Sequence, residues 1–210
     1  MKMSKSFWGQ LLFAEVFTMI FVLVFLPADQ QPYAYSTLYT LLFFTSALNL
    51  DKHRKKMLWV AGSAFLLEWV SQIFNLHYIH AISNVFNVLF FIFMVGMLIT
   101  QISKAEKVTR RVIFEAINGY LFLGVVFSLL IILVVEIQPS AYNFSLGKNV
   151  IMSDIIYYGF VTLSTLGYGD LLPLTPLSKS LSLLTTLGGQ LYLAIIIALL
   201  VGKYSNKESE

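Results

Sequence analysis

The segment 164–170, which reads Ser-Thr-Leu-Gly-Tyr-Gly-Asp, carries its chemistry in the backbone rather than in reactive side chains. Glycines stand at two alternate positions, Gly167 and Gly169. Because glycine adopts positive and negative φ about equally readily, this spacing permits a backbone whose residues alternate in handedness. Successive carbonyl oxygens then point to one side, and rings of such oxygens can replace the hydration shell of a monovalent cation. One chain supplies too few oxygens to surround an ion, so the segment predicts a cation-binding loop shared by several copies.

The residues on either side of this loop predict how it is held. Ile151–Leu163 is apolar and is expected to form a short helix, and Pro173 follows the loop. The carbonyl end of such a helix carries a partial negative charge, which favours a cation. Non-helical backbone is stable at membrane depth only where it lines a cavity or is buried in protein. We therefore expect a short re-entrant helix whose carbonyl end faces the loop.

Composition places most of the chain in a membrane. Of its 210 residues 58% are hydrophobic and 12% are charged, with a mean hydropathy of +0.77, whereas soluble domains carry about 25% charged residues. Six apolar segments are each long enough to cross a hydrocarbon core of about 30 Å as a helix. They are Phe7–Leu26, Tyr33–Leu50, Met57–His80, Ala81–Ile102, Val112–Ile137 and Leu177–Gly202. The sequence therefore predicts an all-α membrane protein with six transmembrane helices and a re-entrant helix and loop between the fifth and sixth.

The basic residues predict the orientation of the chain. Twelve of the fourteen Lys and Arg residues fall in segments that this topology places on one side, and only Lys148 and Lys179 fall on the other. By the positive-inside rule the first side is cytoplasmic, and both termini lie there. The basic residues are then topology signals rather than a nucleic-acid-binding patch, and the cell membrane is the expected location. The chain has no cysteine, which excludes disulfides and thiolate metal sites.

Residues 165–170 resemble the signature sequence of the potassium channel family, Thr-Val-Gly-Tyr-Gly-Asp, with leucine in place of valine. The resemblance implies a K⁺ selectivity filter and a passive channel made of four identical chains. The filter would consist of Thr165, Leu166, Gly167, Tyr168, Gly169 and Asp170. The ion sites would be formed by the carbonyl oxygens of the first four of these residues and by the Thr165 hydroxyl.

The resemblance also assigns supporting roles around the filter. Tyr157 and Tyr158 occupy the positions of paired tryptophans that brace the filter in voltage-gated channels. Their hydroxyls are expected to reach Tyr168 or Asp170. Filter support is also expected from Ser164 and from Glu136, which matches a glutamate that braces the outer end of the filter in those channels.

The last apolar segment resembles the inner helix of the family. Gly189, with Gly188 beside it, matches the gating-hinge glycine, but close helix packing is an equally good explanation of these two residues. Ala194, Ala198 and Gly202 share one helix face, which suggests a tight crossing of the inner helices.

The first 110 residues resemble the voltage-gated superfamily in architecture alone. Residues 1–102 are expected to form a four-helix transmembrane domain similar to a voltage-sensor domain. A sensor needs charges inside the membrane field, and Ala81–Ser103 contains no Arg or Lys. The channel is therefore expected not to be steeply voltage-gated.

The remaining boundaries follow from the same comparison. Residues 103–111 are expected to form an amphipathic cytoplasmic linker helix, because Ile102, Ala105, Val108 and Val112 fall on one face. Its basic residues would then face anionic lipid headgroups. Residues 112–202 would form the pore domain and 203–210 a short cytoplasmic tail.

Glu15 and Glu68 lie inside apolar segments, where ionisable residues are functional candidates by default. They are interpreted either as protonatable residues or as neutral carboxyl groups that specify helix packing through hydrogen bonds.

Two other functions are weighed against the potassium channel. An ion-coupled K⁺ transporter typically keeps one glycine in each of four unequal pore loops, so the one complete loop with Gly167, Tyr168 and Gly169 favours the channel. A weakly selective cation channel usually replaces the Tyr-Gly pair, so Tyr168 and Gly169 argue against it. No nucleophile, metal cluster or phosphate loop suggests an enzyme, and no cofactor is expected besides K⁺ as the permeant ion.

Overall fold

The structure, a computed structural model, describes residues 5–49, 54–74, 77–144 and 152–205, and it is built from helices. Lys2, Lys52, Lys148 and Lys207, which the orientation argument used, lie outside the described residues. The described elements are α1 (Lys5–Phe21), η1 (Leu23–Phe25), α2 (Gln31–Asn49), α3 (Arg54–Phe74), α4 (His77–Lys104), α5 (Arg110–Ile137), η2 (Pro139–Ala141), α6 (Met152–Leu163) and α7 (Pro176–Ser205).

The six long helices fall on the six apolar segments, with two boundaries displaced. The first segment was expected to run to Leu26, but α1 ends at Phe21 and the short η1 follows it. The third segment was expected to run to His80, but α3 ends at Phe74 and α4 begins at His77. That prediction is wrong by several residues, because residues 75–80 contain no Pro or Gly that would mark the boundary in the sequence. Helix α4 begins four residues before the predicted Ala81.

Four helices are long and apolar enough to cross a membrane by length and composition. Their candidate spans are Phe7–Phe25, Ile82–Lys104, Arg110–Ile137 and Pro176–Tyr204. The other two long helices, α2 with 19 residues and α3 with 21, have more polar sequences. The structure thus gives an all-helical membrane protein with four clear candidate spans among its described residues.

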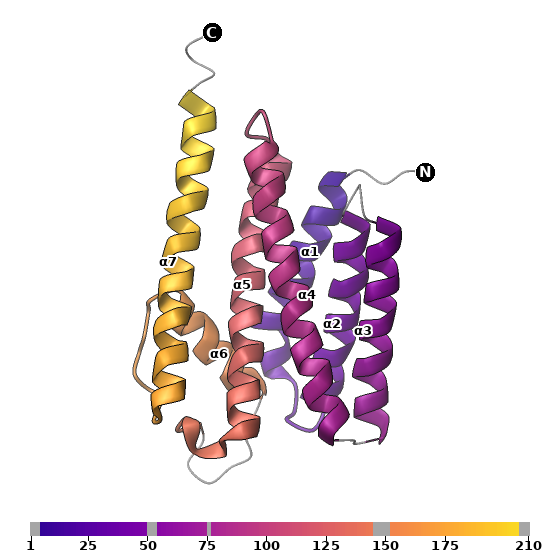
Figure 1. Ribbon diagram of the computed structural model, residues 1–210, viewed down its shortest axis with the longest axis vertical. Helices are drawn as coiled ribbons and strands as arrows, with labels where there is room; N and C mark the ends of the chain where they lie inside the picture. The colour runs from indigo at the N-terminus through magenta and orange to yellow at the C-terminus, as the bar shows by residue number, and fades with distance from the viewer. Residues whose placement is uncertain (1–4, 50–53, 75–76, 145–151, 206–210) are drawn as a thin grey trace.

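Helices α1 to α4 form a bundle, and α5 packs along one side of it against α1 and α4 (Figure 1). Aromatic rings fill the core of this bundle. Phe43 of α2 lies edge-on to Phe90 of α4 with ring centroids 4.7 Å apart, and Phe91 contacts Phe122 of α5 at 5.4 Å. Helix α7 packs on the other side of α5, and the short α6 sits between α5 and α7.

Two hydrogen bonds made by side-chain amides tie α5 to the bundle of its own chain. The Asn118 amide donates to the carbonyl oxygen of Gly9 in α1 at 2.8 Å. Near the other end of α5, the Asn84 amide of α4 donates to Glu136 Oε1 at 2.8 Å. Buried polar groups are paired in this way because an unpaired one is costly in an apolar surrounding. Helix α5 is therefore fixed against α1 and α4 near both of its ends.

The connection between α4 and α5 is an elbow, defined here as residues 103–111. The expected amphipathic helix over this segment is wrong. Helix α4 continues to Lys104 and α5 begins at Arg110, so only residues 105–109 connect them, and these are not helical. Five residues are too few to make a helix whose end groups are satisfied. The Thr109 hydroxyl instead caps α5 by accepting a hydrogen bond from Val112 N at 3.4 Å.

Candidate functional site: the loop after α6

The loop predicted to bind cations begins where α6 ends, and the last turn of α6 organises it. Ser164 N donates to Phe160 O at 2.9 Å, and Thr165 N donates to Thr162 O at 3.1 Å. Leu166 N then donates to Val161 O at 3.0 Å. These bonds pair carbonyls at the C-terminal end of α6 with the amides that follow. The loop is therefore anchored directly to the negative end of the helix dipole.

The backbone of the loop alternates in handedness. The φ angle is positive at Thr165 (62°), Gly167 (52°) and Gly169 (79°), while the described residues between them have negative φ. Left-handed φ is unusual for a β-branched residue such as threonine, and a residue held there costs of order 1–3 kcal/mol. The hydrogen bond from Thr165 N to the end of α6 helps hold it. The alternation is the one expected from the spacing of the glycines.

The loop is uncovered within a single chain. Every residue from 164 to 170 is exposed, and the exposed fractions of Leu166 and Tyr168 reach 53% and 68%. Large apolar side chains exposed to this degree are typical of a surface that another molecule covers.

One of the two supporting tyrosines makes the expected contact and the other does not. The Tyr157 hydroxyl donates to Asp170 Oδ2 at 2.8 Å, and this hydrogen bond raises the pKa of the hydroxyl. The Tyr158 side chain is buried, and its hydroxyl lies 2.6 Å from Ser182 Oγ of α7 instead. The two residues are adjacent on a helix, so their side chains point about 100° apart. Only Tyr157 can therefore face the loop.

The other two predicted supports make local contacts. Ser164 Oγ donates to Val161 O at 3.2 Å, so this side chain helps to close the end of α6. Glu136 accepts a hydrogen bond from Asn84 of α4. Its proposed role in bracing the filter stays a prediction.

The segments on both sides of α6 are joined, which sequence reasoning missed. Leu174 N, after the loop, donates to Ala141 O at 2.8 Å, and Ser178 Oγ of α7 donates to the same carbonyl at 2.7 Å. At the start of α6, Ser153 N donates to Gln31 Oε1 of α2 at 3.3 Å. Residue types and spacing gave no signal for these pairs, because they join positions up to 122 residues apart.

The two glycines of α7 lie where the helix passes close to its neighbours. A Cβ on Gly189 would meet the Leu163 carbonyl oxygen at the end of α6 and would lie 2.9 Å from Leu163 Cδ1. A Cβ on Gly188 would lie 2.9 Å from Cζ of Phe127 in α5. Helix α7 is continuous through both positions. These contacts favour the packing explanation, and a hinge role stays a prediction.

Ala194, Ala198 and Gly202 are all exposed on α7. Apolar side chains of the same helix, including Leu187, Leu191 and Ile195, are exposed by 51–60%. Much of α7 is thus uncovered in the single chain.

Glu15 and Glu68 are both buried and hydrogen-bonded within the bundle. Glu15 Oε1 accepts from the Thr45 hydroxyl at 2.8 Å. Glu68 accepts from the Ser36 and Ser83 hydroxyls, each at 2.8 Å, and from the Asn87 amide at 3.0 Å. These contacts join α1 to α2 and α3 to both α2 and α4. They are the bonds expected of carboxyl groups that specify helix packing.

Comparison with known protein families places the loop in a recognised context. A family model described as ion channel matches residues 129–206, which include the last third of α5, all of α6, the loop and all of α7. The match indicates an ion channel in a membrane, and a transport protein rather than an enzyme. No curated protein and no solved structure matches the chain.

Proposed function

We propose that the protein is a potassium-selective channel and that residues 165–170 form its selectivity filter. The observation that carries the proposal is the alternation of positive and negative φ from Thr165 to Gly169. In this backbone the carbonyl oxygens of successive residues line one side of the chain, where they can replace the water around K⁺. The carbonyls of Thr165, Leu166, Gly167 and Tyr168 and the Thr165 hydroxyl form the ion sites, and K⁺ is the only ligand required.

The channel is a homotetramer. One chain supplies one loop, and a closed ring of four copies surrounds the ion with the carbonyl rings that K⁺ coordination needs. The exposed loop and the exposed apolar face of α7 support this assembly, because a neighbouring copy would cover both. Ala194, Ala198 and Gly202 then let the inner helices cross closely.

Helices α2 and α3 also cross the membrane, which gives six transmembrane helices with α6 as a re-entrant helix. At 1.5 Å per residue, 19 and 21 residues span about 28 and 31 Å. Their polar side chains Ser36, Thr45 and Glu68 are buried in the bundle rather than exposed to lipid.

The orientation and the gating behaviour follow from where the charges lie. Figure 1 shows that α1 begins and α7 ends at the same end of the molecule as the elbow. Basic residues gather at that end, and by the positive-inside rule it is cytoplasmic. Helix α4 carries no Lys or Arg before Lys104, so the bundle is a sensor-like domain without the usual gating charges.

The test is the reversal potential of purified protein in planar bilayers. With a tenfold K⁺ gradient opposed by Na⁺, a K⁺-selective channel reverses near the K⁺ equilibrium potential, about 59 mV from zero. Gly167→Ala should abolish selectivity or current, because a Cβ disfavours the positive φ of that residue. Gly96→Ala is the matched control, since a Cβ there meets nothing within 4 Å.

A reversal potential that follows Na⁺ as closely as K⁺ would assign a weakly selective cation channel instead. Transport that needs a second ion would assign a transporter. The number of chains is tested separately by native mass spectrometry of the purified protein in a mild detergent. A complex no larger than a dimer would contradict the tetramer.

A further inference from the structure

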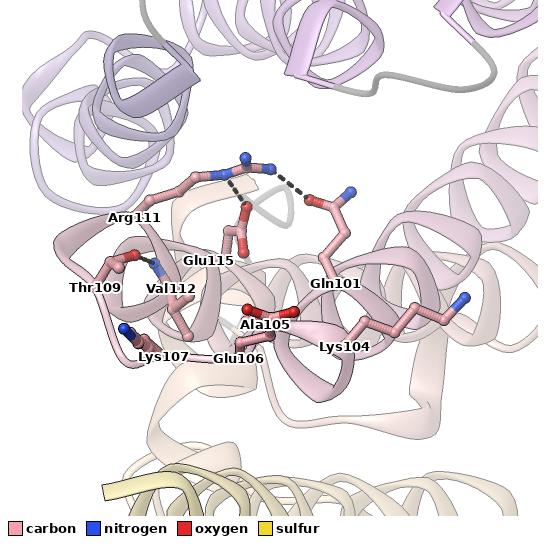
Figure 2. Close-up of a pocket in the computed structure, with 9 residues that line it drawn as sticks. All are labelled: Gln101, Lys104, Ala105, Glu106, Lys107, Thr109, Arg111, Val112 and Glu115. Atoms are coloured by element: carbon pink, nitrogen blue, oxygen red, sulfur yellow. Dashed lines mark hydrogen bonds and ion pairs between the residues drawn. The ribbon is translucent and has the colours of Figure 1, made fainter. Parts of the chain in front are cut away.

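A cavity of about 510 Å³ opens at the elbow between α4 and α5 (Figure 2). It lies at the edge of the apolar zone, because one candidate span ends at Lys104 and the next begins at Arg110. The cavity is therefore at the depth where phospholipid headgroups lie. It is lined by Gln101, Lys104, Ala105, Glu106, Lys107, Thr109, Arg111, Val112 and Glu115.

The charged groups of this cavity leave a net charge of +1. Arg111 is fixed in place by Glu115, whose Oε1 accepts from Arg111 Nε at 2.7 Å, and by Gln101 Oε1 at 3.3 Å from Nη2. Figure 2 shows the guanidinium held between these two side chains. Because Arg111 neutralises the buried Glu115, the remaining balance is Lys104 and Lys107 against Glu106. A single phosphodiester, with a charge of −1, complements this balance.

The backbone around the cavity also favours an anion and is held in place. Thr109, Arg111 and Val112 belong to the capped first turn of α5, where the helix dipole is positive. From α7, Lys203 Nζ donates to Ser103 O at 2.7 Å and also to Ala105 O, a residue of the cavity lining. The end of α7 is thus tied to the elbow.

We propose that this cavity binds the phosphate group of an anionic phospholipid headgroup, through Lys104, Lys107 and the first turn of α5. The proposal goes beyond ion conduction and does not depend on it. The depth of the cavity selects a lipid as the source of the phosphate, and its charge selects an anionic lipid over a zwitterionic one. Basic cavities between membrane helices on the cytoplasmic side are suited to such headgroups.

The experiment measures binding of dihexanoyl phosphatidylglycerol to the purified full-length protein by native mass spectrometry and by thermal shift. Each lysine near an anionic headgroup contributes about a factor of five in affinity. The double variant Lys104→Gln/Lys107→Gln should therefore bind about 30-fold more weakly. The control Lys55→Gln/Lys56→Gln removes two exposed lysines at the same end of the molecule but outside the cavity. It should bind within about twofold of the parent.

A third variant separates the cavity from its charge. Ala105→Phe keeps every lysine and narrows the cavity with a bulky side chain, and it should also weaken lipid binding. An equal loss of lipid binding in Lys104→Gln/Lys107→Gln and in Lys55→Gln/Lys56→Gln would overturn the site, because it would leave only general attraction to the surface. Unchanged lipid binding by Ala105→Phe would also overturn it. Equal affinity for dihexanoyl phosphatidylcholine would overturn the requirement for an anionic lipid. Equal affinity for glycerol 3-phosphate would overturn the lipid as the source. Because no current is measured, these outcomes stand whether or not the channel proves selective for K⁺.

Discussion

Replacing Gly189 by alanine tests whether this residue permits close packing or acts as a hinge. In the structure an added Cβ would meet the backbone carbonyl oxygen of Leu163, which cannot rotate away as a side chain could. Overpacking of this kind costs about 1–3 kcal/mol. Alanine also has a higher helix propensity than glycine, worth about 1 kcal/mol in the opposite direction.

Gly96→Ala isolates the propensity effect, because a Cβ at Gly96 meets nothing within 4 Å. It should stabilise the protein by about 1 kcal/mol. Gly189→Ala should be less stable than Gly96→Ala by about 1–3 kcal/mol, which is about 5- to 150-fold in the unfolding equilibrium constant. Gly188→Ala should cost less than Gly189→Ala, since it meets the end of the Phe127 ring, which can move.

The measurement is unfolding by SDS in mixed micelles, followed by circular dichroism, for the three variants and the parent. A hinge that is free of contacts predicts that Gly189→Ala and Gly96→Ala are equally stable and differ only in open probability. Equal stabilities would therefore refute the packing argument. A lower stability of Gly189→Ala with unchanged helix content would support it.

Three further predictions concern the filter, the bundle and the response to voltage. Tyr157→Phe removes the hydrogen bond to Asp170 and should make the current decay faster during sustained opening. Tyr158→Phe loses a hydrogen bond to Ser182 of α7 instead and should leave the decay unchanged. Similar decay in both variants would contradict the role of Tyr157 in supporting the loop. Asn118→Ala removes the bond to the Gly9 carbonyl and should lower the free energy of unfolding by about 1 kcal/mol in the same SDS titration, and an unchanged midpoint would show that the bond contributes nothing. Open probability should change only shallowly between about −100 and +100 mV, since α4 has no Lys or Arg inside the membrane field. A steep sigmoidal dependence of open probability on voltage in single-channel recordings would mean that another element moves charge.

The sequence was sufficient to predict features that depend on local rules. The six long helices follow from apolar length, and the left-handed backbone at Gly167 and Gly169 follows from the conformational freedom of glycine. The ends of α6 were also close to the prediction, since a short apolar run before a glycine-containing loop leaves little choice. In each case the information lies within a few residues of the feature.

The features that were missed or misread depend on which helices become neighbours. Periodicity alone suggested a helix over the elbow, but the structure uses those residues to lengthen α4 and cap α5. The hydroxyl of Tyr158 was expected near the filter, but its direction depends on where α7 passes α6. The hydrogen bond between Gln31 and Ser153 joins α2 to α6, and the residue types in these two segments do not predict that they are neighbours. Such contacts are decided by packing, which a single sequence does not specify locally.

The shortness of the elbow has a consequence for how the assembly is made. Five residues link α4 to α5, and a chain of this length reaches about 20 Å at most. Helix α5 therefore packs against α1 and α4 of the chain that made it, and each bundle can dock on its own α5 as soon as that helix has been synthesised. In the proposed tetramer, finished subunits would then meet through the uncovered faces of α7 and the loop. When parent and variant chains are mixed in that assembly, every bundle would stay with the α5 encoded on the same chain, so a defect in the bundle would act first on its own subunit.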